Sequence, residues 1–348
     1  MQVILAYKNF AANRAVSHIG LGVTALNVAK SLRAAGVEAN VWPIVSAADL
    51  RNQLHKSAVV SRSSSSEVTH VVVSAPWIQT AELAQLCADF PETRFAVNCH
   101  SNLGFLQADP SAMRLVREGI DLERCTWNFQ IAANCDRLTR WVEKAYAAPC
   151  LYLPNMYYLA GAAPKRALYQ AGTLRIGAFG ATRALKNLMT AAGAAVEIAT
   201  DMRADLEFWL SSGRNEGAGS VMDAVRQMFV GLPHVKLIEN GWQTWPQFRQ
   251  TVRHMHLLLQ PSYTESFNVV TADGAAEGVP SVVSDAIEWA PSNWKAQVDD
   301  AGHIAKVGVR LLRSRWAAPR GFAALGRHNT RAMRMWQGYL DQGYLDQR

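Results

Sequence analysis

The chain has 348 residues, which is long enough for two domains of about 150 residues each. Hydrophobic residues make up 49% and charged residues 18%, a balance typical of a folded globular protein and too apolar for intrinsic disorder. No apolar run reaches the roughly 18 residues that a membrane span needs, and the start MQVILAYKNF lacks the features of a signal peptide, so we expect a cytoplasmic enzyme.

Both halves of the sequence alternate short runs rich in β-branched and aromatic residues with longer helical stretches. The runs are typical of parallel strands and lie at 2–7, 39–44, 70–76, 94–100, 126–134 and 150–155, then at 174–179, 206–212, 235–240, 256–262 and 280–285. Between them, 24–36 and 187–199 have helical patterns. The alternation predicts an α/β protein with two doubly wound parallel sheets in tandem, and a boundary within 150–165.

The cysteines give no sign of a cross-linked or metal-bound framework. Their number is odd and no two of them form a CxxC pair, so we expect buried, reduced thiols at Cys87, Cys99, Cys125, Cys135 and Cys150.

The net charge of +7 is concentrated near the C-terminus. Residues 302–334 contain no Asp or Glu, and their basic residues are Lys306, Arg310, Arg313, Arg315, Arg320, Arg327, Arg331 and Arg334. Such a stretch favours a phosphate-bearing partner, either nucleic acid or an anionic lipid surface. We expect nucleic acid, because few apolar anchors accompany the arginines. A solvated helix face is the alternative.

The segment PSYTESFNVVTADGAAEGVPSVV, residues 261–283, places two acids on a predicted strand, loop and helix. The helix is expected to begin near Ser266 and to end at Gly278, with Glu265 just before it and Asp273 eight positions after Glu265. Ligands of open α/β sheets bind beyond the carboxyl ends of the strands, so Glu265 is expected to face the ligand rather than only to cap the helix.

The start of the same helix is a candidate anion site. Its backbone amides point out of the first turn, where the helix dipole favours negative charge. We therefore expect the amides of Ser266, Phe267 and Asn268 to bind a phosphate group.

Together with four other segments, this stretch resembles the retaining glycosyltransferases of family four. The run from Glu265 to Asp273 with AAEGVPSVVSD is similar to the acid-x7-acid motif of that family. HIGLGVTALNVAKSLRAAGVEANVW is similar to its glycine-rich loop and first helix, VNCHSN to its histidine-bearing strand end, YLPNMY to its interdomain segment, and IGAFGATRALKNL to its basic turn. The family has the GT-B fold, in which two facing Rossmann-like domains are separated by a cleft.

The resemblance implies a role for each matching residue. Glu265 would contact hydroxyls of the donor sugar, and Asp273 would hold the ribose. The diphosphate leaving group would be neutralised by Arg183 and Lys186, and His100 would serve at the catalytic centre. Gly20 and Gly22 would lie in the glycine-rich loop.

Three positions of the matching segments differ from the usual family pattern. Asp273 stands where the family usually has Glu, and Asn268 stands where it frequently has Gly. Arg183 lies two positions later than the arginine of the common Gly-Arg pattern.

The resemblance also implies the organisation and the chemistry of the whole chain. Residues 1–155 would form the acceptor-side domain, 156–325 the nucleotide-sugar-binding domain, and 326–348 a helical tail that crosses back. The reaction would transfer a sugar from a nucleotide-sugar, with UDP-sugar expected, and would retain the anomeric configuration. No D-x-D triplet occurs, so we expect no metal and no other cofactor. The alternative is an inactive glycosyltransferase-like protein that binds nucleic acid or membrane.

Overall fold

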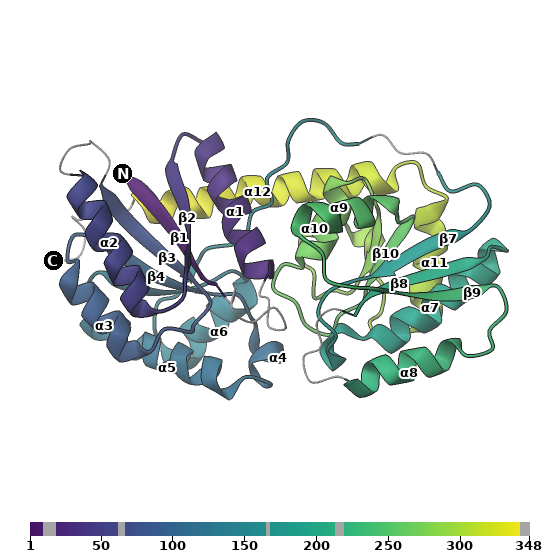
Figure 1. Cartoon of the computed structure of the whole chain (residues 1–348), viewed down its shortest axis with the longest axis horizontal. Coiled ribbons are helices and arrows are strands. Elements are labelled where there is room, and N and C mark those ends of the chain that lie inside the picture. The colour runs from purple at the N-terminus through teal and green to yellow at the C-terminus, as the bar shows by residue number, and fades with distance from the viewer. Residues whose placement is uncertain (10–18, 62–66, 165–167, 213–218, 342–348) are drawn as a thin grey trace. The chain divides into compact units, whose positions relative to one another are not determined.

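The computed structural model describes residues 1–9, 19–61, 67–164, 168–212 and 219–341 (Figure 1). The chain divides into two compact units. The first contains Met1–Tyr158 and Asn329–Arg348, and the second contains Leu159–His328.

The strands of the first unit form one parallel sheet. They are β1 (Gln2–Lys8), β2 (Glu38–Ile44), β3 (Val68–Ser74), β4 (Arg94–Cys99), β5 (Phe129–Ala133) and β6 (Leu151–Tyr152). Their order across the sheet is β2-β1-β3-β4-β5-β6, and every pairing is parallel. Nearly continuous burial along β1 and β3 agrees with a sheet covered on both faces.

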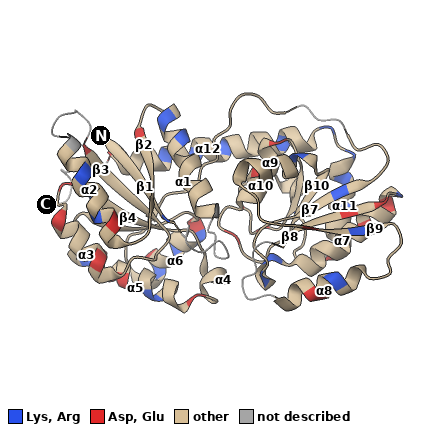
Figure 2. Ribbon diagram, viewed as in Figure 1, with Lys and Arg blue, Asp and Glu red and all other residues tan. Residues whose placement is uncertain are grey.

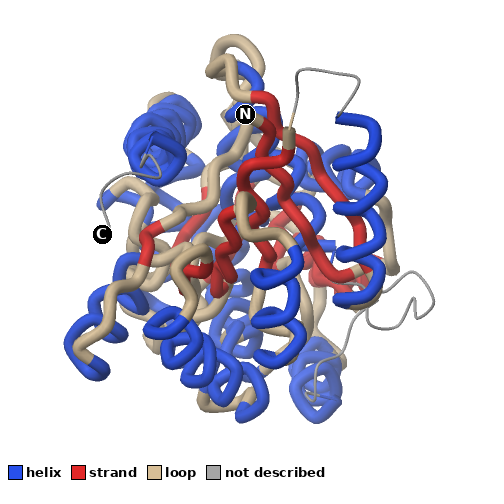
Figure 3. Tube along the Cα trace, turned by 90° about the vertical axis from the view of Figure 1, so that its left-hand side faces the viewer, coloured by secondary structure: helices blue, strands red, loops and turns tan. Residues whose placement is uncertain are grey.

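Helices cover both faces of this sheet, as the nearer part of Figure 3 shows. They are α1 (Ile19–Ala34), α2 (Ala47–Ser61), α3 (Thr80–Asp89), α4 (Leu103–Leu106), α5 (Pro110–Cys125) and α6 (Asp136–Tyr146). On one face, α2, α3, α5 and α6 pack through residues such as Leu50, Leu86 and Ile120. On the other, α1 packs with the end of α12. Successive residues of β1 alternate between these two cores, as strand geometry requires.

The final helix, α12 (Ala317–Asp341), begins in the second unit and ends in the first. In the first unit, Asn329 exchanges hydrogen bonds with the backbone of Tyr157, accepting from its N–H at 3.0 Å and donating to its carbonyl at 2.7 Å. The indole of Trp336 donates to the Pro154 carbonyl at 2.9 Å. These contacts attach the helix to the segment that follows β6.

The second unit contains another parallel sheet, of order β11-β10-β7-β8-β9. Its strands are β7 (Leu174–Ala178), β8 (Leu206–Ser211), β9 (Val235–Asn240), β10 (Leu257–Gln260) and β11 (Ser281–Val283). Its helices are α7 (Leu188–Met202), α8 (Gly219–Phe229), α9 (Trp245–His254), α10 (Val269–Ala276), α11 (Ala301–Leu312) and the first part of α12, with short 3₁₀ turns at Ala184–Lys186 and Ser292–Trp294.

The two faces of this second sheet are covered by different helices. Leu258 of β10 packs into a cluster with Val252 of α9 and with Val270 of α10. Its neighbour Leu257 lies on the opposite side, where an added methyl group on Gly308 of α11 would come within 3.1 Å of it. Gly308 therefore permits the close approach of α11 to the sheet.

The predicted α/β fold class with two parallel sheets is confirmed, and every predicted strand has a counterpart. The prediction that Gly20 and Gly22 lie in a loop is wrong, because both belong to α1. A Cβ at position 22 would come within 3.1 Å of the Tyr7 ring, so the missing side chain lets the helix pack closely against β1.

The structure also shows the state of the cysteines and the length and hydropathy of the helices. All five cysteines are free thiols; four are buried as predicted, whereas Cys125 is exposed. In the part of the chain that the structure describes, none of the helices is both long and apolar enough to cross a bilayer.

Candidate active site

The strand order of the second unit reverses between β7 and β10. The chain proceeds from β7 outward to β8 and β9, and then returns to place β10 on the other side of β7. In open α/β sheets, ligands bind beyond the carboxyl ends of the strands at such a reversal. Lys186 follows β7 and Glu265 follows β10, so the sheet brings them to the same place.

The turn after β7 is held by backbone geometry and by β8. Gly180 has a φ of 119°, which glycine adopts far more readily than other residues. Its N–H donates to the Ser211 hydroxyl at 3.3 Å, and the Thr182 hydroxyl donates to the Ser211 carbonyl at 3.2 Å. Arg183 caps the short 3₁₀ turn, and its carbonyl accepts from the N–H of Lys186 at 3.0 Å. These bonds fix where the Lys186 side chain begins.

The segment after β10 is tied to the same turn. The N–H of Tyr263 donates to the Leu185 carbonyl at 3.0 Å. The side-chain amide of Asn187 donates to the carbonyls of Pro261 at 3.3 Å and Val298 at 2.6 Å. The two loops therefore form one structure, and the spacing between Lys186 and Glu265 is set by the backbone.

Lys186 and Glu265 form an ion pair through Nζ and Oε1. Their side chains are only 15% and 12% exposed, respectively. The amide of Asn268 donates to the same Glu265 oxygen at 3.0 Å and to the buried Gln260 at 3.0 Å. Because charges interact more strongly when water is partly excluded, water screens this ion pair less than it would screen a pair on the open surface.

Asn268 also determines where the next helix begins. Its φ is 62°, so it cannot belong to α10, and its Oδ1 accepts from the Thr271 N–H at 2.8 Å as an N-cap. The predicted helix start near Ser266 is wrong by three residues, because α10 begins at Val269. A position with positive φ is readily occupied by either Gly or Asn, which explains how Asn268 can replace the Gly that is frequent in the family.

The expected anion site is altered by the same finding. The amides of Ser266, Phe267 and Asn268 precede the helix instead of forming its first turn. Phe267 is buried, its carbonyl accepts from the Trp289 indole at 2.6 Å, and its ring lies 5.3 Å from that of His328. The Phe267 side chain is therefore part of the packing beneath the site.

Asp273 lies on α10 and is 1% exposed. Its Oδ1 accepts from the Trp245 indole N–H at 2.9 Å. The guanidinium of Arg249 lies 5.5 Å from the centre of the Trp245 ring and pairs with Glu277. This chain of contacts joins α9 to α10 and fixes the orientation of the Asp273 carboxylate.

Two contributors were not identified from the sequence. One is Trp245, which no spacing rule in the sequence links to Asp273. Gln260 could have been noticed, because it is a polar residue at the end of an otherwise apolar strand and is 3% exposed.

His100, Gly20 and Gly22 belong to the first unit, whereas the other predicted site residues belong to the second. His100 directly follows β4, at the carboxyl edge of its own sheet. Burial lowers the pKa of His100 to about 4, so its imidazole is neutral at pH 7 and offers one donor and one acceptor nitrogen.

Among the described residues, no group of three or more His, Cys, Asp and Glu side chains is placed to hold a metal ion.

No protein-family model matches the chain, and no curated protein matches it in sequence. Several solved structures have a similar fold. Trehalose-6-phosphate synthase OtsA is 10% identical with a TM-score of 0.63, over 98% of this chain and 99% of that one. Sucrose-phosphate synthase from Thermosynechococcus elongatus is 12% identical with a TM-score of 0.60, over 97% and 98%.

A third similar structure is TarM from S. aureus, a mutant in complex with Fondaparinux, alpha-GlcNAc-glycerol and UDP. It is 10% identical with a TM-score of 0.59, and the match covers 78% of this chain but 55% of TarM. The fold of the present chain is therefore that of the GT-B glycosyltransferases, with two parallel sheets and interleaved helices.

Proposed function

We propose that the protein is a glycosyltransferase that moves a sugar from a UDP-sugar to an acceptor with retention of anomeric configuration. The observation that carries the proposal is the low-exposure ion pair of Lys186 and Glu265 at the strand-order reversal of the second sheet. At this position the cation can bind the diphosphate of the donor, and the carboxylate can bind hydroxyls of its sugar.

In the proposed donor complex, Lys186 exchanges its carboxylate partner for the diphosphate. Arg183, on the same turn, adds a second positive charge. Negative charge develops on the diphosphate as the glycosidic bond breaks, and these cations stabilise it in that state. The released Glu265 carboxylate then accepts hydrogen bonds from hydroxyls of the donor sugar.

Asp273 is the proposed partner of the ribose hydroxyls, oriented by Trp245. Retention follows from a front-face route, which the family resemblance implies. The bond from the anomeric carbon to the phosphate oxygen breaks, and the acceptor oxygen bonds to that carbon on the same face. The acceptor proton passes to the leaving phosphate. His100 is the proposed contribution of the first unit to the catalytic centre.

Two observations support UDP as the nucleotide and a reaction without metal. TarM, which has the same fold, was crystallised with UDP. The basic residues Lys186 and Arg183 supply positive charge of the kind that a divalent cation would otherwise provide for a diphosphate. The proposed donor is therefore a UDP-sugar bound without a cation.

The acceptor is not specified by these residues. The sequence of the basic stretch Lys306 to Arg334 predicted a polyanionic acceptor such as DNA, but the exposed apolar side chains of Trp316 and Leu168 favour a lipid surface over nucleic acid there.

The test is the slow hydrolysis of UDP-sugars by water in place of the acceptor. The protein is incubated with a panel of UDP-hexoses and UDP-N-acetylhexosamines in EDTA, and released UDP is measured. We expect one donor to be hydrolysed, with loss of activity in Glu265→Gln. The control is Glu197→Gln, which removes an exposed carboxylate from α7 of the same unit. Proton NMR of the first sugar released reports whether the anomeric configuration is retained.

The competing function is a glycosyltransferase-like binding protein without activity. It predicts that UDP binds while no donor in the panel is hydrolysed. Equal hydrolysis by Glu265→Gln and Glu197→Gln would also contradict the proposed role of Glu265.

A further inference from the structure

The turn between α11 and α12 carries three exposed arginines around an exposed tryptophan. Arg313 is the C-cap of α11, Arg315 and Trp316 lie in the turn, and Arg320 lies in the first turn of α12. Trp316 is 55% exposed. We call these four residues the basic corner. All of them belong to the second unit. Figure 2 shows basic residues in blue on both helices.

The arginines of the basic corner differ from exposed arginines elsewhere in the chain. Arg114, Arg140 and Arg226 each pair with a carboxylate on the surface, those of Glu118, Asp136 and Glu239 respectively. Across the described residues, Arg313, Arg315 and Arg320 form no ion pair with a carboxylate, and the segment 302–334 contains no acid at all. Their positive charge is therefore not neutralised locally and extends into solvent.

Trp316 is presented outward by the backbone of the corner. Its N–H donates to the Ser314 hydroxyl at 3.3 Å, and its carbonyl accepts from the Arg320 N–H at 3.1 Å. The second bond puts Trp316 and Arg320 one helical turn apart on the same face. The Arg315 guanidinium lies 5.3 Å from the centre of the indole ring. An aromatic ring and cations thus share one surface.

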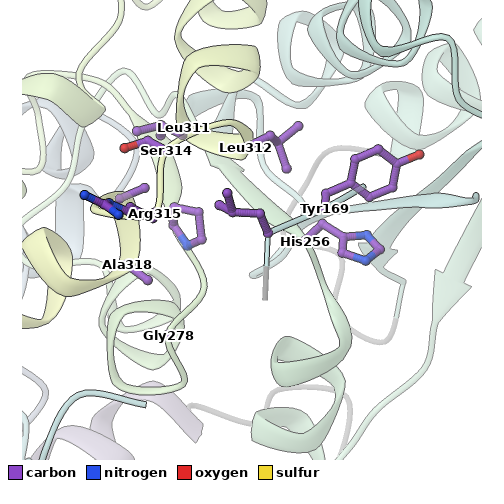
Figure 4. Close-up of a pocket in the computed structure, with 11 residues that line it drawn as sticks. Tyr169, His256, Gly278, Leu311, Leu312, Ser314, Arg315 and Ala318 are labelled. Atoms are coloured by element: carbon purple, nitrogen blue, oxygen red, sulfur yellow. The ribbon is translucent and has the colours of Figure 1, made fainter. Parts of the chain in front are cut away.

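A small pocket adjoins the corner (Figure 4). Its volume is about 40 Å³, and it is lined by Leu168, Leu311 and Leu312 among others. Ser314 and Arg315 lie on one side of it, with Tyr169 and His256 on the other. Leu168 is 42% exposed, so apolar surface lies next to the charged corner.

We propose that the basic corner docks the protein on an anionic membrane surface. The arginines bind lipid phosphates, and Trp316 lies at the level of the head groups, where the amphipathic indole is favoured. Leu168 and the pocket rim provide further apolar contact with the bilayer surface. This proposal concerns a surface away from the candidate active site and does not rest on the proposed function.

Lipid is favoured over nucleic acid for two reasons. Single-stranded nucleic acid binds by stacking bases on open aromatic faces, whereas Arg315 already lies over a face of Trp316. The expectation of nucleic acid rested on a scarcity of apolar anchors, and the structure places Trp316 and Leu168 on the surface. Both residues suit a bilayer better than a phosphate backbone.

The test is flotation of the full chain with vesicles of phosphatidylcholine, alone or with about 30% phosphatidylglycerol, at about 50 mM and about 500 mM salt. The corner variant combines Arg313→Gln, Arg315→Gln and Arg320→Gln. The charge-matched control combines Arg114→Gln, Arg140→Gln and Arg226→Gln. Melting curves establish that both are folded.

We expect the protein to bind the anionic vesicles at low salt and to bind neutral vesicles poorly. The corner variant should lose roughly 100-fold in affinity, since each arginine near such a surface contributes roughly fivefold. The control should bind as the unmodified protein does, and Trp316→Ala should weaken binding at both salt concentrations. Equal binding by the two triple variants would overturn the proposal. So would the absence of vesicle binding at low salt, or binding of duplex or single-stranded DNA in its place.

Discussion

Replacing Glu265 with Gln separates binding of the nucleotide from transfer of the sugar. Glu265 holds Lys186 in an ion pair and accepts a hydrogen bond from Asn268. A diphosphate must therefore compete with Glu265 for Lys186. The Gln side chain has the same shape and can still accept from Asn268, but it carries no charge. UDP is therefore expected to bind the variant at least as well as the unmodified protein.

The size of the effect follows from the exposure of the pair. Two unit charges 4 Å apart interact by about 4 kcal/mol at an effective dielectric constant of about 20. The side chains are only 12–15% exposed, so both charges lose part of their hydration when the pair forms. The cost of this desolvation cancels most of the attraction. We expect a net gain of about 1 kcal/mol, or roughly fivefold tighter UDP binding. Turnover should fall about 100-fold or more, because the variant loses the contact that we propose Glu265 makes with the sugar in the transition state.

Isothermal titration with UDP and the hydrolysis assay measure the two effects separately, with Glu197→Gln as the control. The free energy of unfolding of Glu265→Gln should decrease by about 1–2 kcal/mol, since Lys186 loses its partner at low exposure. A folded variant whose UDP affinity falls more than about tenfold would refute the reasoning, because Glu265 would then bind or position the nucleotide.

Three further predictions follow from the site and from the first unit. Asp273→Ala should weaken UDP binding about 10- to 100-fold, and Trp245→Phe should reduce the preference for UDP over 2′-deoxy-UDP in a titration, because the indole orients the carboxylate that we propose binds ribose. Lys186→Ala should lower both UDP affinity and turnover, whereas unchanged affinity would remove Lys186 from the donor site. Burial, and to a smaller extent the charge of Arg94, lowers the pKa of His70 to about 4. Between about pH 6.5 and 4 the unfolded chain therefore binds a proton that the folded protein does not, so the protein should lose stability as the pH falls through this range. In urea denaturation at several pH values, His70→Phe should remove about 3 kcal/mol of this pH dependence of the unfolding free energy. An unchanged pH dependence in the variant would contradict the role of His70.

The strands and the fold class could be predicted because burial imposes a strong local pattern. Inner strands of a parallel sheet covered on both faces are buried along most of their length and are rich in apolar residues, as β3 and β10 are. The reversal of strand order could not be seen in any single segment, because it depends on which strands pair. Its functional consequence, the meeting of Lys186 and Glu265, came from the resemblance to a family instead.

The details that could not be predicted depend on the backbone conformation of single residues or on contacts between residues far apart in the sequence. The start of α10 was misplaced because Asn268 adopts a positive φ, which sequence periodicity does not reveal. Gly22 was predicted to lie in a loop, but it belongs to α1, where the lack of a side chain permits close contact with Tyr7. The hydrogen bond from Trp245 to Asp273 joins two helices 28 positions apart, and no local rule predicts it.

We propose that the second unit binds a nucleotide-sugar through Lys186 and its neighbours without a metal ion. Thermal unfolding of the full chain in EDTA, with UDP or UDP-sugars at about 1 mM, tests it most directly, since a ligand that binds only the folded state stabilises it in proportion to its affinity. We expect a rise in Tm with UDP that persists in EDTA and is lost in Lys186→Ala. No shift with any nucleotide, or an equal shift in Lys186→Ala, would contradict nucleotide binding through Lys186.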